Sequence, residues 1–461
     1  MTGLSITRRG FCAGLVAASV ARPAWANADP LTAQKASVQL APDGYGATQV
    51  WSYDGTIPGP VLRYRQGDRL TQKLVNQLDV PTSVHWHGIR IDNAMDGVAG
   101  LTQEAVPPGG TFDYDFVLPD AGTYWYHAHT NSMEQVARGL SGALIVEEPA
   151  PLDVDRDEVL VLDDWLLDPE TGDFAEPFAH PMMMSHGGRT GNLVGVNGRY
   201  DFRLTAQKGD RLRLRLINAA NARIFSLRLQ GMDAWTVALD GMPLHAPEAV
   251  DSEITLAPAQ RVDLIVDITA DEGAPAGLLM WMQDDSWQAL VEVAVSGRSA
   301  RTTRPAPAAL PPNQAMDLPD LSQARSLELV MEGGAMAGMD SATYQGEQLD
   351  FRALIDRGQF WALSGQAGRS DTPFADLSRG DVLRVKLTNR TAFPHGMHLH
   401  GMHFRQVRAD GTFGPLRDTI LSIPNEPLEI AFTADNPGKW LFHCHMLAHA
   451  ASGMTTWINV A

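Results

Sequence analysis

Residues 209–218 read Gly-Asp-Arg-Leu-Arg-Leu-Arg-Leu-Ile-Asn, with leucine at every second position from 212 to 216. Alternation with period two is typical of a half-buried β-strand, because successive side chains point to opposite faces of a sheet. The opening Gly-Asp-x-Leu, with Asn nine residues after the Gly, occurs twice more, at 67–76 and 380–389. A second phrase follows each copy, around Gly122, Gly277 and Gly438, and precedes another strand-like run. The chain is therefore predicted to contain three copies of one β-rich unit.

The composition favours an all-β fold of three consecutive domains. The chain has 461 residues, 42 of them Gly and 29 Pro, and its strand-like runs are short. This length excludes a disulfide-stabilised miniprotein and a disordered chain. Short strands between Gly- and Pro-rich turns favour Greek-key β-sandwiches of roughly 120–150 residues each. The predicted domains are residues 27–150, 151–297 and 325–461, with a Pro-rich linker at 298–324.

The N-terminus is predicted to be a removable export signal. Arg8-Arg9 precede an apolar run at 11–21 and the small-x-small site Ala24-Trp25-Ala26, a pattern typical of a twin-arginine secretion signal. The apolar run is about half the roughly 20 residues that a membrane span needs. Residues 1–26 contain three arginines and no acid, so their removal changes the net charge from −18 to −21. We expect a periplasmic protein with no membrane span and no affinity for nucleic acid.

Cysteine usage needs a chemical reason. The chain has two cysteines, Cys12 in the predicted leader and Cys444 near the C-terminus. The exported chain would keep one thiol and could form no internal disulfide. A lone cysteine in such a protein is a buried hydrophobe, a metal ligand or a nucleophile.

Four His-x-His pairs occupy matched positions in the first and third repeats. Counted from the repeated Asn or from the later Gly, the pairs are His85/His87, His127/His129, His398/His400 and His443/His445. The middle repeat has Leu227, Leu229, Met282 and Asp284 at these positions. Residues two apart on a strand share a face, so eight imidazoles are predicted to form a metal cluster between the outer domains. Imidazole alone suits zinc, copper, iron and nickel, and structural histidine couples are the alternative.

Cys444 selects the metal. It lies between two of the cluster histidines, so its sulfur points to the opposite face of the strand. There it can join His395, His449 and Met454. Two imidazoles, a thiolate and a distant thioether are the ligands of a blue-copper electron-transfer site. The corresponding positions of the first repeat hold alanine and threonine, so this site is predicted in the last domain alone.

These motifs resemble those of the three-domain multicopper oxidases, the laccase-like superfamily of repeated cupredoxin folds. The motifs are His85-Trp86-His87-Gly88, His127-Ala128-His129, residues 395–401 and residues 443–454. The resemblance implies an oxidoreductase that reduces O2 to water, fed by four one-electron oxidations that pass through Cys444. It also implies four copper ions. Their ligands would be His395, Cys444, His449 and axial Met454 for type-1 copper; His85 and His398 for type-2 copper; and His87, His127 and His445 with His129, His400 and His443 for the type-3 pair.

Reduction of O2 consumes protons, so a carboxylate near the cluster is expected to relay them. Asp96, followed by Gly97, stands where the resembling family places such an acid. A turn-forming Asp-Gly is the alternative. Some relatives carry a second acid after the last type-1 histidine, and this chain has Ala450 there. The sequence leaves the second proton donor open.

Methionine is the clue to the electron donor. Met182-Met183-Met184 with His186 form one cluster, and Met331, Met336 and Met339 with Asp340 form another. Thioethers favour Cu(I), although methionine more often fills core gaps. The resemblance to copper-tolerance oxidases places cuprous ion first, phenols and aromatic amines second and ferrous iron third. We expect a monomer.

Three alternatives remain on the sequence alone. A copper-free scaffold of the same fold would lack ligands, and this chain has all ten histidines, Cys444 and Met454. A non-catalytic copper-storage protein would bind copper without consuming O2. A nitrite reductase would need a lone type-2 copper, which four His-x-His pairs argue against.

Overall fold

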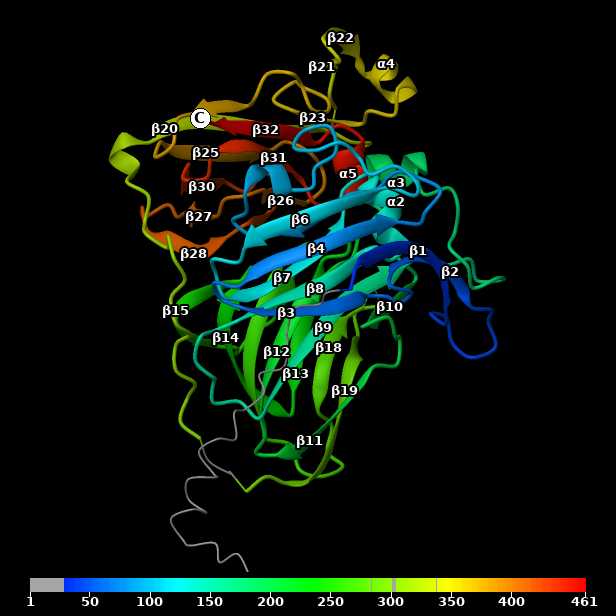
Figure 1. Cartoon of the computed structure of the whole chain (residues 1–461), viewed down its shortest axis with the longest axis vertical. Helices are drawn as coiled ribbons and strands as arrows, with labels where there is room; N and C mark the ends of the chain where they lie inside the picture. Colours follow the sequence, from blue (N-terminus) through cyan, green and yellow to red (C-terminus); the bar gives the residue numbers. More distant parts are fainter. Residues whose placement is uncertain (1–28, 283, 301–303, 337) are drawn as a thin grey trace, which may run out of the picture.

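Three consecutive β-sandwiches make up the chain (Figure 1). The computed structural model describes residues 29–282, 284–300, 304–336 and 338–461. The predicted export signal at 1–26 lies outside the described residues. The predicted all-β fold is confirmed, because the regular structure consists of paired sheets with a few short helices.

The first sandwich packs the sheet β2-β1-β4-β6 against the sheet β3-β8-β7-β5. Its elements are β1 (Leu31–Val38), β2 (Thr48–Tyr53), β3 (Gly59–Arg65), β4 (Arg69–Asn76), β5 (Val84–His87), η1 (Asn93–Met95), β6 (Thr111–Val117), β7 (Gly122–Ala128), α2 (Ser132–Ala137) and β8 (Ser141–Glu147). The inner strands β5 and β7 are buried along their whole length, which suits a site inside the fold.

The second sandwich has a six-stranded sheet, β10-β9-β12-β17-β14-β15, and a five-stranded sheet, β11-β19-β18-β13-β16. Its elements are β9 (Arg156–Trp165), α3 (Pro181–Ser185), β10 (Leu193–Val196), β11 (Arg203–Lys208), β12 (Arg211–Asn218), β13 (Phe225–Gln230), β14 (Met232–Leu239), β15 (Met242–Ala249), β16 (Ile254–Leu256), β17 (Arg261–Ile268), β18 (Gly277–Trp281) and β19 (Trp287–Arg298). This domain has a hydrophobic core of its own, which includes Leu214, Phe225 and Leu264.

The third sandwich has the sheets β23-β20-β25-β30-β27-β28 and β24-β32-β31-β26-β29, with the hairpin β21-β22 beside them. Its elements are η2 (Leu321–Gln323), β20 (Arg325–Gly333), β21 (Ser341–Tyr344), β22 (Glu347–Asp350), α4 (Phe351–Asp356), β23 (Trp361–Leu363), β24 (Ala375–Leu377), β25 (Val382–Asn389), β26 (His395–Leu399), β27 (Phe404–Val407), β28 (Phe413–Arg417), β29 (Thr419–Ser422), β30 (Leu428–Thr433), β31 (Gly438–Cys444), α5 (Leu447–Ala451) and β32 (Thr455–Val460). Its core is continuous with that of the first domain, so the two outer domains bury one joint apolar cluster.

The repeated phrase forms the same strand three times. It becomes β4, β12 and β25, each of which pairs in parallel with the first strand of its domain and antiparallel with a later one. The Gly before each strand has a positive φ, and the following Asp accepts a main-chain N–H three residues earlier, closing a turn. The repeat predicted from the sequence is therefore a repeat of backbone geometry.

The repeated asparagine fixes the chain path after each of these strands. In every copy its Nδ2 donates to two main-chain carbonyls and its Oδ1 accepts the N–H two residues on. The residues are Asn76, Asn218 and Asn389. The next strands are β5, β13 and β26, so the asparagine sets where the strand with the first His pair begins in the outer domains.

The prediction of a half-buried strand at 211–218 is wrong for this copy, because all eight residues of β12 are buried. Its arginine face lies against the first domain instead of water. Arg213 donates to Glu148, which follows β8, and Arg215 donates to Thr123 on β7. Buried carboxylates neutralise these cations, so a row that resembles a solvated face in sequence is a charged domain interface.

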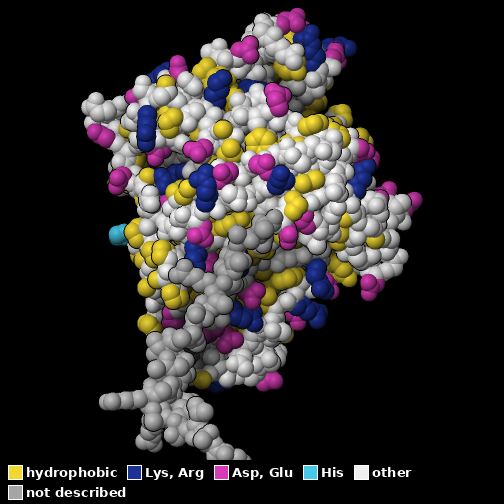
Figure 2. All heavy atoms as spheres, viewed as in Figure 1, with side chains coloured by type: hydrophobic (Ala, Val, Ile, Leu, Met, Phe, Trp, Pro, Cys, Tyr) yellow, Lys and Arg dark blue, Asp and Glu magenta, His cyan; other side chains and the backbone are white. Residues whose placement is uncertain are grey.

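The described part of the chain has no helix long and apolar enough to cross a membrane. The surface in Figure 2 carries acidic and basic side chains intermixed over all three domains. With 54 acidic against 36 Lys and Arg residues, the chain is acidic overall.

Candidate metal centres

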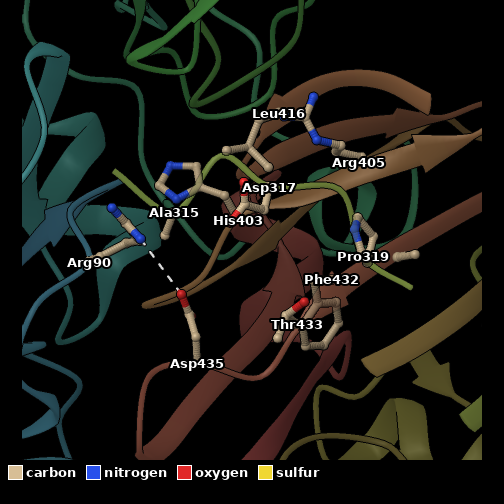
Figure 3. A pocket seen from close by; sticks show the side chains of 11 residues that line it. Arg90, Ala315, Asp317, Pro319, His403, Arg405, Leu416, Phe432, Thr433 and Asp435 are labelled. Atoms are coloured by element: carbon tan, nitrogen blue, oxygen red, sulfur yellow. Dashed lines mark ion pairs between the residues drawn. The ribbon is translucent and has the colours of Figure 1, made fainter. Parts of the chain in front are cut away.

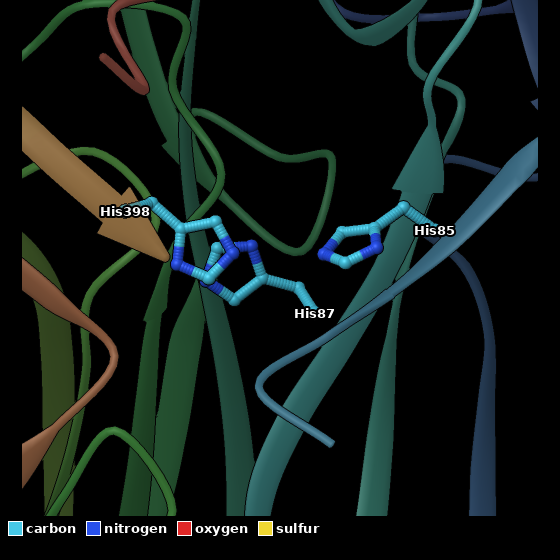
Figure 4. A group of neighbouring side chains, drawn as sticks. All are labelled: His85, His87 and His398. Atoms are coloured by element: carbon cyan, nitrogen blue, oxygen red, sulfur yellow. The ribbon is translucent and has the colours of Figure 1, made fainter. Parts of the chain in front are cut away.

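The His-x-His pairs lie on neighbouring strands. In the first domain β5 pairs with β7 so that His85 stands opposite His127, and in the third β26 pairs with β31 so that His398 stands opposite His443. The second member of each pair lies at or just beyond the strand end. Figure 4 shows His85 and His87 reaching from the first domain toward His398 of the third.

The two sets of histidines meet between the outer domains. The ring of His87 stacks on that of His398, with centroids 3.7 Å apart, and the ring of His85 stacks on that of His400 at 3.9 Å. Three groups of histidines have ring nitrogens within 4.8 Å of one another. They are His85/His87/His398, His87/His127/His445 and His129/His400/His443.

Hydrogen bonds fix the orientation of five of these rings. In each, Nδ1 faces a carbonyl or carboxylate oxygen, where it donates, so Nε2 keeps its lone pair. The pairs are His85 with the Asp96 carbonyl, His127 with the Ala128 carbonyl, His398 with the Asp418 carbonyl, His400 with the Asp96 carboxylate and His443 with the Cys444 carbonyl. Rings held in this way present a neutral nitrogen to a metal.

Several ring nitrogens in the cluster are buried without a hydrogen-bond partner. They are Nε2 of His85, His129 and His398 and Nδ1 of His87 and His445. Buried polar atoms in proteins are nearly always partnered, so such a set has the chemistry of a metal site. Burial also lowers the pKa of His87, His398 and His445, and that of His129 to about 3, which keeps these imidazoles neutral and able to bind a metal. The donor set fits copper ions.

A separate group forms on the other face of β31. Nδ1 of His395 and Nδ1 of His449 lie 3.0 Å apart, and each lies 3.7 Å from Sγ of Cys444. All three side chains are fully buried. Burial raises the pKa of the Cys444 thiol to about 12 and lowers that of His449 to about 4. A thiolate therefore forms here only beside a cation, as in a type-1 copper site.

Met454 lies beside this group, fully buried, with its main-chain N–H bonded to the His449 carbonyl and its carbonyl accepting from the N–H of Cys444. The far nitrogens of both imidazoles are engaged. Nε2 of His395 is 2.7 Å from Oγ1 of Thr391, and Nε2 of His449 donates to the carbonyl of His186 at 2.6 Å. These contacts leave both Nδ1 lone pairs facing the sulfur.

The His186 carbonyl comes from the middle domain, from the segment just after α3. This short helix packs on α5, which carries His449. Trp361 joins the two, because its ring lies 4.4 Å from that of His449 and its Nε1–H donates to the Met184 carbonyl. Neither Trp361 nor the His186 carbonyl was singled out from the sequence. Every residue type has a main-chain carbonyl, so no sequence motif could have identified this one.

Asp96 lies fully buried at the end of η1. Its carboxylate oxygens are 3.1 and 3.2 Å from Nδ1 of His400, and its main-chain carbonyl accepts from His85 at 2.8 Å. A Cβ on Gly97 would overlap the carbonyl of Val84, so the turn after Asp96 requires glycine. The geometry therefore combines the two roles weighed for this Asp-Gly pair, a tight turn and a carboxylate at the cluster.

Asp418 is a buried acid that the sequence did not single out. Its Oδ1 is 3.3 Å from Nε2 of His87, and its main-chain carbonyl accepts from His398. On its other side Nε2 of His403 lies 3.8 Å from Oδ2. Asp418 belongs to no repeated motif, so only the spatial arrangement identifies it.

His403 lines a cavity of about 300 Å³ at the edge of the third domain (Figure 3). Arg90 and Asp435 form an ion pair in its wall, and the buried His403 ring has no hydrogen-bond partner on either nitrogen. Burial lowers the pKa of His403 to about 3. His403 and Asp418 thus form a chain of contacts from this cavity to His87 of the cluster.

The two methionine clusters meet at one place. The N–H of Ala335 donates to the carbonyl of Ser185, which joins the loop after β20 to α3. Met182 and Met336 are 58% and 72% exposed there, whereas Met184, Met331 and Met339 are buried. The clusters thus divide into three core methionines, the half-buried Met183 and two exposed thioethers on segments that are joined at α3.

Family models described as multicopper oxidase match residues 34–151, 156–277 and 343–461. These three segments contain every histidine of the cluster and the Cys444 group. Their order follows the three sandwiches.

Individual proteins are similar over nearly the whole chain. Multicopper oxidase MmcO of Mycobacterium tuberculosis is 30% identical across 98% of this chain and 90% of its own length. A copper resistance protein A homolog of Pseudomonas syringae is 26% identical across 98% of this chain and 99% of its own. Among solved structures, Lac15 from a marine microbial metagenome is 42% identical with a TM-score of 0.75, covering 94% of this chain and 99% of that one. A multi-copper oxidase of Pseudomonas thermotolerans is 35% identical with a TM-score of 0.81, covering 94% and 98%.

Proposed function

Because this chain belongs to the multicopper oxidase family, whose members are oxidoreductases that use O2 and a reducing electron donor, we propose that it is a cuprous-ion oxidase of copper homeostasis with laccase-like activity. The net reaction would convert four Cu(I), O2 and four protons into four Cu(II) and two water molecules. The observation that carries the oxidase chemistry is that β31 contributes His443 to the histidine cluster and Cys444 to the buried group with His395 and His449.

We propose four copper ions, held by the ligands that the sequence predicted. Type-1 copper would take His395, Cys444 and His449, with the thioether of Met454 as a further ligand. Type-2 copper would take His85 and His398, and the type-3 pair would take the groups His87/His127/His445 and His129/His400/His443. When bound, these ions supply one-electron transfer and the centre at which O2 is reduced. Two of the three histidine groups described above consist of the same residues as the sets proposed for the type-3 pair.

The chain connects the two centres within three residues. Cys444 is covalently joined to His443 and His445, and its carbonyl accepts from Nδ1 of His443 at 2.9 Å. An electron that reaches the sulfur is therefore a few bonds from two cluster ligands. Complete burial of all three side chains excludes water from this path.

Asp96 is proposed as the proton relay. Its carboxylate accepts the Nδ1–H of His400 and lies 3.2 Å from Nδ1 of His85. It can hold a proton at the edge of the cluster without competing for the nitrogens that face the metals. With Ala450 at the position of a second acid, Asp418 is the other buried carboxylate in contact with cluster histidines, through His87 and His398.

Cu(I) is preferred as the donor because of what covers His449. The Nε2–H of His449, the outer edge of the ring, already donates to the His186 carbonyl and is buried. A phenolic hydroxyl has no access to that N–H. The carbonyl of Met182 accepts the N–H of His186, and Met336 follows Ala335, whose N–H donates to the carbonyl of Ser185. Both methionines are exposed, and thioethers are ligands that favour Cu(I). Relatives named copper resistance protein A are consistent with this choice.

Phenols and aromatic amines are the second candidate. A cavity of about 400 Å³ lies beside the same group, lined by Trp281, Met282, Pro394 and Met446 among others. Pro394 and Met446 lie one and two residues from His395 and Cys444. An aromatic ring could pack there against Trp281, which is 41% exposed. Ferrous iron ranks third, and a relative named iron transport multicopper oxidase fetC is 28% identical.

The test compares turnover of the copper-loaded enzyme on Cu(I), Fe(II) and a phenol, measured as O2 uptake. The double variant Met182→Leu/Met336→Leu should raise KM for Cu(I) by about tenfold, equal to about 1.4 kcal/mol of binding, and leave phenol oxidation unchanged. Met331→Leu, at a fully buried position, is the matched control. Equal effects on both donors would contradict cuprous specificity, and copper binding without O2 uptake would instead indicate a storage protein.

Domain limits, location and oligomeric state complete the proposal. The domains are proposed at 27–150, 151–297 and 325–461 with the linker at 298–324, in a monomer. Export to the periplasm by the twin-arginine route is supported by the sequence of residues 1–26. Replacement of Arg8-Arg9 by two lysines should leave the protein in the cytoplasmic fraction of the producing cells.

A further inference from the structure

One charged side chain of the middle domain reaches the histidine cluster. Arg261, the first residue of β17, is fully buried and extends into the space between the outer domains. Its Nη1 and Nη2 donate to both oxygens of Asp418 at 2.9 and 2.6 Å. Nε donates to the carbonyl of Thr123 on β7, and Nη1 also donates to the carbonyl of Ala259. The guanidinium thus links all three domains.

Asp418, which Arg261 holds, also contacts two of the proposed copper ligands, His87 and His398. Its Oδ1 lies 3.3 Å from Nε2 of His87 and 3.5 Å from Nδ1 of His398, and its own carbonyl accepts from the same Nδ1 at 2.9 Å. The two rings are stacked and nearly parallel, at an interplanar angle of 18°. Their remaining nitrogens, Nδ1 of His87 and Nε2 of His398, are among the unpartnered ring nitrogens of the cluster.

The sequence around His87 is shaped to admit Arg261. Gly88 has φ +88°, and a Cβ built there would overlap Nη2 of Arg261 and lie 2.7 Å from Oδ2 of Asp418. The guanidinium therefore occupies the space that any other residue at position 88 would fill. This accounts for the glycine of the His85-Trp86-His87-Gly88 motif in physical terms.

We propose that Arg261 is a positioning residue for the type-2 copper region: it holds Asp418 in the one place from which that carboxylate orients both His87 and His398. A bidentate Arg–carboxylate pair fixes orientation as well as distance, which a lysine could not do. Residues that orient metal-bound histidines affect metal affinity by about 10–100-fold. The middle domain thereby acts on a centre to which it contributes no ligand in the proposed assignment.

The proposal rests on the proposed copper assignment, and its test separates the two. Arg261→Gln is compared with the control variant Arg213→Gln. Arg213 lies on the neighbouring strand β12 and is as deeply buried as Arg261. It pairs with Asp263 and with Glu148 at the interface with the first domain. Copper per chain, the type-2 electron paramagnetic resonance signal and the blue absorption are measured in wild type and variants. If the wild type itself lacks a type-2 signal, the copper assignment fails.

Arg261→Gln should weaken binding of the type-2 copper about 10–100-fold in competition with a chelator, with the blue absorption retained. Arg213→Gln should keep the type-2 signal. A type-2 signal and affinity unchanged in Arg261→Gln, or lost equally in Arg213→Gln, would overturn the proposal. Should Arg261→Gln not fold, Asp418→Asn, which keeps size and the main-chain bond to His398, must show the same selective loss.

Discussion

Gly88→Ala tests the packing of Arg261 against the His87 strand end. The new methyl would meet two obstacles: a backbone at φ +88°, and the guanidinium of Arg261, whose Cζ would lie 3.1 Å from it. The positive φ costs an L-residue about 1–2 kcal/mol. Displacing Nη2 also breaks a charge-assisted hydrogen bond to Asp418, worth about 1.5–3 kcal/mol. The expected loss of stability is the sum, about 2.5–5 kcal/mol.

Gly67→Ala is the control for this prediction. Gly67 has nearly the same φ, +87°, and a Cβ there meets no atom within 4 Å. That variant should therefore lose only the backbone contribution of about 1–2 kcal/mol. Both are measured on copper-free protein by denaturant unfolding, with attention to separate transitions because three domains need not unfold together. Equal destabilisation of the two variants would refute the argument that Arg261 fills the space beside Gly88.

Three further results are expected. Cys444→Ser should abolish the intense blue absorption and oxidase turnover and lower the copper content by one ion per chain, while the type-3 pair still loads; retained turnover would contradict the proposed electron path. Asp96→Asn should lower kcat roughly 100-fold with the blue absorption intact, because a buried amide holds His400 but does not relay protons; an unchanged kcat would assign the relay elsewhere. Copper-free protein should lose stability as the pH falls from about 6.5 to 4. Burial lowers the pKa of His449 to about 4 and of His129 to about 3 in the folded chain. Over this pH range the unfolded chain therefore binds protons that the folded chain does not. Each such histidine contributes up to about 1.4 kcal/mol per pH unit, and a flat thermal-unfolding profile over this range would contradict their burial as neutral rings.

The threefold repeat of the fold could be predicted because the residues that form the turns around one strand recur in each domain. A Gly at positive φ, an Asp that closes the turn and an Asn that brackets the next loop recur with fixed spacing, so a self-comparison finds them. The His-x-His pairs follow from the same spacing, and the structure brings them together between the outer domains.

Contacts between domains could not be predicted in this way. The arginines of β12 alternate with leucines as on a solvated strand, and only the position of the first domain shows that they are buried. Asp418 and Arg261 are 157 residues apart and belong to no repeated phrase. Their partnership depends on how three sandwiches dock, which a local pattern does not encode.

The cover over His449 is made by a main-chain atom. Because the His186 carbonyl is part of the backbone, no single side-chain substitution can delete it, and only a change in the course of residues 180–190 would uncover the imidazole edge. Laboratory evolution of this enzyme toward bulky organic reductants should therefore succeed through insertions or deletions in that segment sooner than through point changes at its surface.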